Sequence, residues 1–353
     1  MAASSARSSS TPHVNAVSFY AEYHGHRVVL LDKCLQSLRA KPERSVIWLL
    51  GDSSLDNKHW LYGDGGKGSL ADNDFCADAL NGYEHILRPT RMVRDVAYWM
   101  NALLCPKAGA DAADVPAVIN CAVEESTVAD RSSTLLPQDC FVRDHVRDRD
   151  TLVVSVGGND IALRPSIKTI TSMAALLLCS SASCISSCSC VCSMARGCSC
   201  GLPTGLAHFV DLFGAQIERY IERVVAVRKP RRVCVCMIYY PDETSGGSWA
   251  DGVLSKLGYD SNPAKLQALI RKVFQLATQR IHVEGTEVQA VPLFRALDCR
   301  HTADYKQRVE PSVSGGRKMA AVILEHVLPE SPASAAVGEA RMAWRAEGLG
   351  ELL

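Results

Sequence analysis

Five short apolar runs recur along the chain, each bounded by polar or turn-forming residues. They are too short to be buried helices, and most are rich in β-branched residues. Buried strands of a parallel sheet have this pattern, because both of their faces are covered. We therefore predict strands at 46–50, 117–119, 152–156, 231–241 and 287–294.

Longer segments between these runs carry apolar residues at helical spacing. This spacing predicts helices at 28–38, at 90–105 with Thr90 as the cap, at 206–227, from Asn262 and Pro263 onwards, and at 318–324. Strands that alternate with helices indicate a doubly wound α/β sheet. A chain of 353 residues can form one elaborated α/β domain or two small ones.

Two of the predicted strands lead directly into small polar motifs. Gly51-Asp52-Ser53 follows the first strand, and Gly157-Gly158-Asn159-Asp160 follows the strand at 152–156. Open α/β sheets place their chemistry at such strand ends. A serine at one end and an asparagine at another suggest a nucleophile facing an oxyanion donor, which indicates acyl transfer.

These two motifs, in this order, resemble the first and third blocks of the SGNH hydrolases, also called the GDSL esterase/lipase family. The resemblance spans roughly residues 45–328. It implies a three-layer α/β/α fold of flavodoxin-like type with a central parallel sheet. It also implies that Ser53 is the nucleophile, and that its N–H and the Asn159 side chain hold the oxyanion. The matched residues that would support them are Gly51, Asp52, Gly157 and Asp160.

The second block of the family reads Asn-x-Gly-x-x-Gly, and its last glycine supplies another oxyanion donor. The counterpart here runs from Asn120 to Glu125, so Glu125 takes the position of that glycine. A backbone N–H survives the exchange if Glu125 adopts the backbone conformation that glycine reaches more easily. Its carboxylate would have to point away from the developing negative charge.

The fifth block of the family reads Asp-x-x-His-Pro and leads into the last helix. Two assignments compete for it. On the family spacing, Glu310 stands in the place of the catalytic histidine and Gln307 in the place of the aspartate. A literal Asp-x-x-His stands slightly upstream, with Asp298 and His301. Both assignments remain open at the level of the sequence.

The two candidate bases differ in their chemistry. A histidine titrates near neutral pH, so His301 could take the Ser53 proton and return it to the leaving group. A carboxylate with an ordinary pKa near 4 is a poor base for a hydroxyl. Glu310 would therefore need burial to raise its pKa.

Composition narrows the function classes. Lys and Arg together number 38, equal to Asp and Glu, and no long basic run occurs, which argues against a nucleic-acid partner. Residues 1–26 are predicted to be a disordered tail. No apolar segment of a secretory signal follows them, so a cytoplasmic location is expected, with a short organelle transit sequence as the alternative. Residues 27–330 form the predicted domain, and 331–353 an appendage.

An insert at about 167–205 carries seven of the 15 cysteines and has no charged residue between Lys168 and Arg196. We predict no metal site, since the Cys-x2-Cys knuckles of structural zinc are missing. The candidate metal ligands, if a site exists, are Cys188, Cys190, Cys192, Cys198 and Cys200. Other interpretations are a low-complexity lid and peripheral membrane association through acylated cysteines.

The predicted function is hydrolysis of small-molecule carboxylic esters, acyl esters or lipids, through an acyl-enzyme on Ser53, with no cofactor. The alternative is a catalytically impaired protein of the same fold that binds an ester, a membrane, a metal or a partner. The altered fifth block favours this alternative, whereas the intact first and third blocks oppose it.

Overall fold

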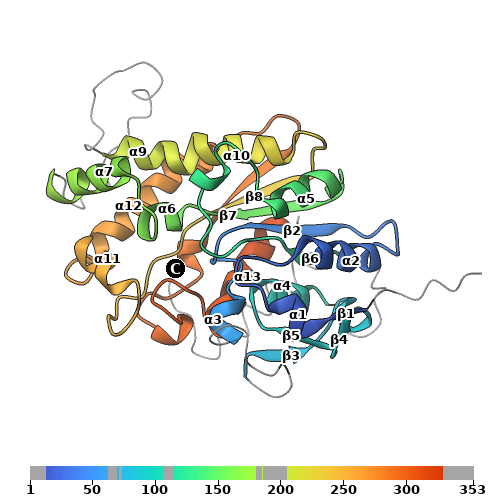
Figure 1. The fold of residues 1–353 in the computed structure, drawn as a ribbon. Coiled ribbons are helices and arrows are strands. Elements are labelled where there is room, and N and C mark those ends of the chain that lie inside the picture. Colours follow the sequence, from blue (N-terminus) through green and yellow to red (C-terminus); the bar gives the residue numbers. More distant parts are fainter. Residues whose placement is uncertain are drawn as a thin grey trace, which may run out of the picture.

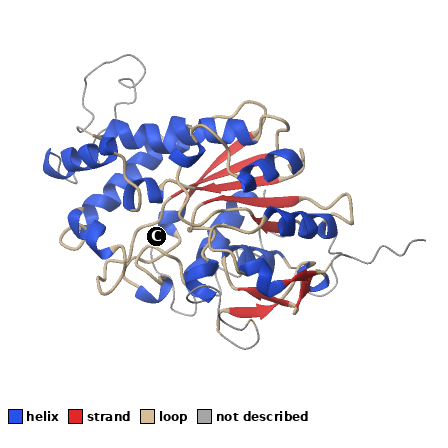
Figure 2. Ribbon diagram, viewed as in Figure 1, coloured by secondary structure: helices blue, strands red, loops and turns tan. Residues whose placement is uncertain are grey.

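The five predicted strands form one parallel sheet in a computed structural model of the chain (Figure 2). The structure describes residues 13–62, 70, 74–105, 115–179, 185 and 205–328. The strand order is β6-β2-β7-β8-β9. Their bounds are β6 Ala117–Asn120, β2 Val46–Gly51, β7 Thr151–Ser155, β8 Arg232–Met237 and β9 Glu287–Pro292.

The strand order places a topological switch point beside β2. The chain runs from β2 outward to β6, and then returns to β7 on the other side of β2. This is the flavodoxin-like doubly wound order, in which ligands bind beyond the carboxyl ends of the strands at the switch point. In the parallel register Leu49 lies opposite both Asn120 and Val153, so the carboxyl ends of the three strands meet at one edge.

Helices cover both faces of the sheet (Figure 1). Successive side chains of a strand point to opposite faces. Trp48 and Leu50 thus pack into one core cluster with residues of α2 (Val28–Leu38), α5 (Pro137–His145), α10 (Ile217–Val224) and α12 (Pro263–Leu276). Ile47 and Leu49 pack into another with residues of α4 (Val96–Leu104) and α13 (Val313–Val327). The architecture is therefore a three-layer α/β/α arrangement around a parallel sheet.

A helix lies at each of the predicted positions, and the structure adds helices that were not predicted. Their bounds are α2 Val28–Leu38, α4 Val96–Leu104, α5 Pro137–His145, α6 Gly158–Ala162, α7 Ile167–Cys179, α9 Leu206–Asp211, α10 Ile217–Val224, α11 Asp251–Lys256, α12 Pro263–Leu276 and α13 Val313–Val327. A π-helical turn, Leu212–Gln216, joins α9 to α10. The single helix expected at 206–227 is thus a continuous helical segment with one wide turn.

The helix predicted at 90–105 begins later than expected. Residues Arg91–Val93 form strand β5, which pairs antiparallel with β3, Cys76–Asp78. Asp95 rather than Thr90 is the cap, and its side chain accepts a hydrogen bond from Tyr98 N at 2.7 Å. The first residues of the predicted helix therefore form a short strand instead, because they pair with a segment that lies earlier in the sequence.

Residues 13–26 differ from the expected disordered tail. They form β1, Val14–Asn15, and α1, Ala16–Tyr20, and β1 pairs with β4, Leu87–Arg88. Phe19 and Tyr20 are buried, and the ring of Phe19 stacks on His26 at 4.0 Å between centroids. These residues join the main core cluster, because their aromatic side chains find apolar neighbours that lie far away in sequence.

The remaining short helix is α3, Lys58–Tyr62. Of the Cys-rich insert, α7 and residue 185 are described, and the five candidate metal ligands between 188 and 200 lie outside the described residues, as does the predicted appendage at 331–353. In the described part of the chain no helix is both long and apolar enough to cross a bilayer. The same part holds no group of three or more His, Cys, Asp or Glu that could bind a metal ion.

Candidate active site

The Ser53 turn begins where β2 reaches β7. Gly51 has φ 137°, and a Cβ atom at this position would lie 1.7 Å from the carbonyl oxygen of Ser155, so only glycine lets the two strands approach here. The N–H of Asp52 then donates to the same Ser155 oxygen at 3.0 Å. Ser53 thereby leaves the sheet at its carboxyl edge, as the sequence motif predicted.

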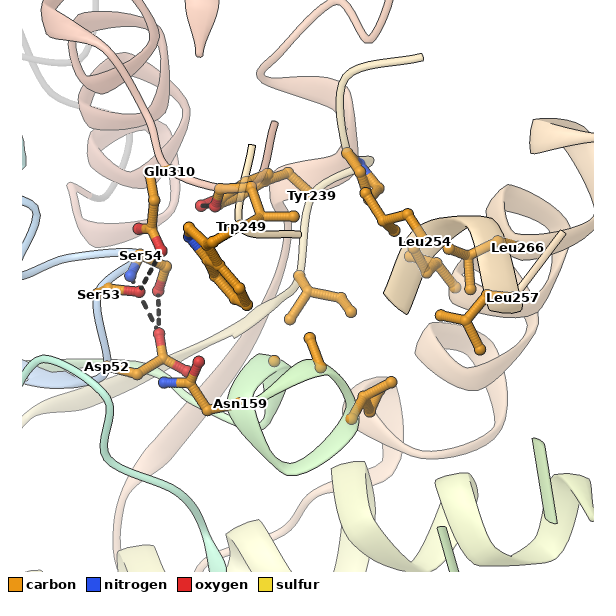
Figure 3. A pocket seen from close by; sticks show the side chains of 17 residues that line it. Asp52, Ser53, Ser54, Asn159, Tyr239, Trp249, Leu254, Leu257, Leu266 and Glu310 are labelled. Atoms are coloured by element: carbon orange, nitrogen blue, oxygen red, sulfur yellow. Dashed lines mark hydrogen bonds between the residues drawn. The ribbon is translucent and has the colours of Figure 1, made fainter. Parts of the chain in front are cut away.

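The residues on both sides of Ser53 hold this turn in place. Asp52 Oδ1 accepts hydrogen bonds from Ser54 N at 3.1 Å and from Ser54 Oγ at 2.7 Å (Figure 3). The Ser54 hydroxyl also contacts Ser155 Oγ at 2.7 Å. Burial raises the pKa of Asp52 to about 6, and its hydrogen bonds to Ser54 oppose this rise. Asp52 therefore supports the turn.

Arg131 is a structural residue that the sequence motifs do not reveal. Its guanidinium is fully buried and forms an ion pair with Asp139 at 3.0 Å. It donates to Gly51 O at 3.0 Å and to Ser126 Oγ at 2.9 Å, so it links the end of β2 to the loop after β6. Nothing in the local sequence distinguishes this arginine from an exposed one.

Glu310 is the residue that contacts the Ser53 hydroxyl. Ser53 Oγ lies 3.2 Å from Glu310 Oε1, and Glu310 is 2% exposed (Figure 3). The backbone on either side of Glu310 is held by a hydrogen bond from Tyr239 to Val309 O at 2.5 Å and another from Asn57 to Pro311 O at 3.0 Å. The residue at position 310, which matches the histidine position of the family pattern, therefore lies within hydrogen-bond distance of the Ser53 hydroxyl.

The electrostatic environment of Glu310 changes its acidity. Burial raises its pKa to about 8; the hydrogen bond from Ser53 opposes this rise, and the charges of Asp52 and Asp56 add to it. The objection that an ordinary carboxylate is too weak a base at neutral pH does not apply to a group with such a pKa.

His301 lies away from Ser53. Its imidazole is 44% exposed and its Nδ1 lies 3.4 Å from Asp304 Oδ1, while the other oxygen of Asp304 accepts from Lys318 at 2.5 Å. Asp298, the proposed partner of His301, accepts instead from the backbone N–H of Arg300 at 3.0 Å. Neither residue lines the cleft at Ser53. The structure thus does not bring the upstream Asp-x-x-His to the nucleophile.

Gln307, which matches the aspartate position of the family pattern, does not contact Glu310 through any described hydrogen bond. Its Oε1 accepts from Trp249 N at 3.4 Å and its carbonyl accepts from Ser248 at 2.6 Å. These bonds attach the segment before α11 to the loop that carries Glu310. Gln307 therefore holds two loops together and does not orient Glu310.

Asn159 lies across the cleft from Glu310, at the start of α6 (Figure 3). The turn before it depends on Gly157, which has φ 117° and where a Cβ atom would lie 2.7 Å from the ring of Phe213. Asn159 Nδ2 donates one hydrogen bond to Ser126 O at 3.1 Å, and an amide nitrogen carries a second N–H. Asp160 accepts from the N–H groups of Val128 and Ala129 and so fixes the neighbouring loop.

Glu125 has the backbone conformation that the sequence comparison required. Its φ is 60°, in the left-handed region that favours glycine. Its carboxylate accepts a hydrogen bond from Tyr23 at 3.0 Å, and it does not line the cleft. The carbonyl of Glu125 accepts from the Arg164 guanidinium. The side chain is thus directed to Tyr23 rather than to the space above Ser53.

Comparisons of the chain with protein-family models, with curated proteins and with solved structures returned no match.

The cleft at Ser53 is polar at one end and apolar elsewhere. It encloses about 730 Å³ of space that is partly open to solvent. Figure 3 shows the polar groups on one side and the leucines of α11 and α12 on the other. The apolar lining comprises Ile161, Ala162, Ile238, Pro241, Trp249, Leu254, Leu257, Leu266, Ile270 and Val309. Leu254 and Leu257, like Leu266 and Ile270, follow helical spacing in the sequence. This spacing predicts burial and does not reveal that the residues face a cleft.

The arrangement brings together a hydroxyl, a buried carboxyl group and an amide donor. A hydroxyl that shares a hydrogen bond with a base of raised pKa can be deprotonated as it attacks a carbonyl carbon. Donors on the opposite wall can hold the oxygen that becomes negative. The site therefore has the parts that acyl transfer requires.

Proposed function

We propose that this protein is a serine hydrolase of the SGNH type that cleaves carboxylic esters through an acyl-enzyme on Ser53, with Glu310 as the general base. The observation that carries the proposal is the 3.2 Å contact between Ser53 Oγ and Glu310 Oε1 in a cleft that Asn159 also lines. The Gly51-Asp52-Ser53 and Gly157-x-Asn159-Asp160 motifs, at the ends of β2 and β7, support the same conclusion.

Each step of the reaction has a residue to carry it. Ser53 Oγ attacks the ester carbonyl carbon while its proton passes to the Glu310 carboxylate. The oxyanion accepts hydrogen bonds from the N–H group of Ser53 and from Asn159 Nδ2, which both line the cleft. The alcohol leaves with the proton from Glu310. Water then attacks the acyl-enzyme, giving one proton to Glu310, which returns it to Ser53 as the acid departs.

Labelling with a fluorophosphonate, followed by mass spectrometry of the modified peptide, tests the proposal. We expect an adduct on Ser53 that is lost in Glu310→Gln and retained in His301→Gln. The reverse pattern would move the base to His301. An unlabelled Ser53 in correctly folded protein would contradict an activated nucleophile.

A second candidate function is binding of an ester or an acyl group without turnover. It is favoured by the altered fifth block, because a glutamate, Glu310, and not a histidine contacts the Ser53 hydroxyl. An unlabelled Ser53 together with saturable binding of an ester would support this function. The cytoplasmic location and the lack of a nucleic-acid partner stay predictions.

Asn159→Ala tests the oxyanion site. Loss of one such donor typically lowers kcat by about 10²–10³-fold, because the interaction forms only with the charged intermediate. We expect this loss in ester hydrolysis, with little change in KM. Asn262→Ala is the matched control, since Asn262 is exposed and makes no side-chain hydrogen bond as a cap. An unchanged kcat in Asn159→Ala would remove Asn159 from the reaction.

Ala162→Trp tests the apolar wall as the site of the acyl chain. Ala162 lines the cleft together with Ile161 and Leu266, and the added indole would fill space beside them. We expect kcat/KM for an octanoyl ester to fall by about 10-fold or more, because several buried methylenes, each worth about 0.8 kcal/mol, lose their place. The value for an acetyl ester should change little. Equal losses for both esters would place the acyl chain elsewhere.

A further inference from the structure

Another buried glutamate, Glu124, lies in the loop that follows β6. Glu124 is 2% exposed, as is Glu310. Its Oε1 accepts a hydrogen bond from Trp60 Nε1 at 3.1 Å, just as Glu310 Oε1 is engaged by Ser53. The Oε2 atoms of both glutamates are buried and have no hydrogen-bond partner among the described residues. Each of these oxygens requires an explanation, because a buried acceptor without a hydrogen-bond partner is costly.

Two consecutive residues hold both glutamates in the same part of the site. Asp56 Oδ2 accepts from the backbone N–H of Glu124 at 3.2 Å. Asn57 Nδ2 donates to the carbonyl of Pro311, next to Glu310, at 3.0 Å. The loop after Ser53 thus fixes the backbone of Glu124 on one side and the segment that carries Glu310 on the other.

The described charged groups around Glu124 and Glu310 place little net positive charge beside either carboxyl group. Lys58 binds both oxygens of Asp56, at 2.6 and 2.8 Å, and so neutralises that carboxylate. Asp52 faces Glu310, and on the outer side His24 Nδ1 contacts the carbonyl of Glu124 at 3.2 Å. Two neighbouring phenols, Tyr23 and Tyr239, are uncharged, because burial raises the pKa of each above its ordinary value.

The carboxyl groups of Glu124 and Glu310 lie within electrostatic range of each other. Burial raises the pKa of Glu124 well above its ordinary value, and the charge of Glu310 is the next largest cause of the rise. Two carboxylates that share a buried site cannot both ionise. One proton held between them removes the repulsion and also gives each orphaned oxygen a partner.

We propose that Glu124 is the positioning residue for Glu310: it remains protonated and donates a hydrogen bond to Oε2 of the ionised Glu310 carboxylate. This orients Glu310 Oε1 towards Ser53 Oγ, and it replaces the Asp-x-x-His pair with two carboxyl groups from separate loops. The proposal rests on the proposed hydrolase function.

The test compares Glu124→Ala with Glu124→Gln in ester hydrolysis across pH, using a p-nitrophenyl ester as the probe. Misplacement of a catalytic group by about 1 Å can cost about 10²-fold, so we expect kcat to fall 10- to 100-fold in Glu124→Ala. The glutamine amide is neutral and can donate to Glu310, so Glu124→Gln should recover most of that loss. Glu243→Gln is the control, because Glu243 is a partly buried glutamate away from the cleft.

The pH profile separates a positioning role from a merely structural one. In the wild type, ionisation of Glu124 at high pH removes the donated hydrogen bond, so activity should fall again at alkaline pH. Glu124→Gln has no such ionisation and should lack this falling limb. Equal activity in all variants, or a glutamine variant as impaired as the alanine variant, would overturn the proposal.

A readout independent of turnover distinguishes failure of this proposal from failure of the proposed function. If Ser53 is neither labelled nor active, the hydrolase function fails, and the pair is judged by thermal unfolding against pH. A shared proton predicts that Glu124→Gln, Glu310→Gln and the double variant are strongly non-additive between neutral and alkaline pH. Additive effects would show two independent carboxyl groups and overturn the pair.

Discussion

Ser53→Ala is expected to lower kcat for ester hydrolysis by about 10⁴- to 10⁶-fold. The hydroxyl is the group that forms the covalent intermediate, and no other lining residue at the polar end offers both a hydroxyl and a base: Ser54 is engaged by Asp52 and Ser155. Loss of a serine nucleophile removes most of the rate enhancement over the uncatalysed reaction. The small enhancement that remains comes from the oxyanion donors and from substrate binding. Initial rates with a p-nitrophenyl ester measure the effect.

The control for Ser53→Ala is Ser261→Ala, which removes a hydroxyl from an exposed turn. Burial of Ser53 makes unfolding a concern, so melting temperatures of the two variants should be compared with the wild type. A Ser53→Ala protein that keeps its fold and more than a tenth of the wild-type rate would rule out the acyl-enzyme.

Glu310→Gln is expected to lower kcat by about 10²–10⁴-fold, the usual contribution of a general base. The glutamine amide fills the same space and cannot accept the serine proton. The base must be ionised, and burial raises its pKa to about 8, so wild-type kcat should rise with pH and level off above about pH 8. This rising limb should be absent in Glu310→Gln.

The variants identify the group that produces the rising limb. A limb that disappears in His301→Gln and persists in Glu310→Gln would assign the base to His301 and contradict the Glu310 assignment.

The raised pKa of Glu310 also makes the stability of the fold dependent on pH. The folded state prefers the protonated carboxyl group, so this contribution is fully present below the unfolded pKa near 4.3 and is lost as pH rises through the folded pKa of about 8. Glu310→Gln should therefore lose less stability than the wild type between pH 5 and 9, as measured by thermal unfolding.

The sheet was predictable from the chain because its signals are local. Runs such as 46–50 and 152–156 are apolar on both faces of a strand, and each formed a strand at that position. The helix at 90–105 was less predictable, because Arg91–Val93 pairs with Cys76–Asp78, and no local pattern encodes such a partner. The same applies to residues 13–26, whose burial depends on distant core residues.

The site divides in the same way. Ser53 and Asn159 could be located from the sequence, because short motifs at the ends of two neighbouring parallel strands must meet at one edge of the sheet. The base that acts on Ser53 could not be located from the sequence. Glu310 and His301 both lie in the loops between β9 and α13, where the direction of a side chain depends on long-range contacts. Hydrogen bonds from Tyr239 and Asn57, far away in sequence, bring Glu310 to the serine. The pairing of Glu310 with Ser53 was therefore decided by the tertiary structure, because loop backbones take their positions from the elements that they contact.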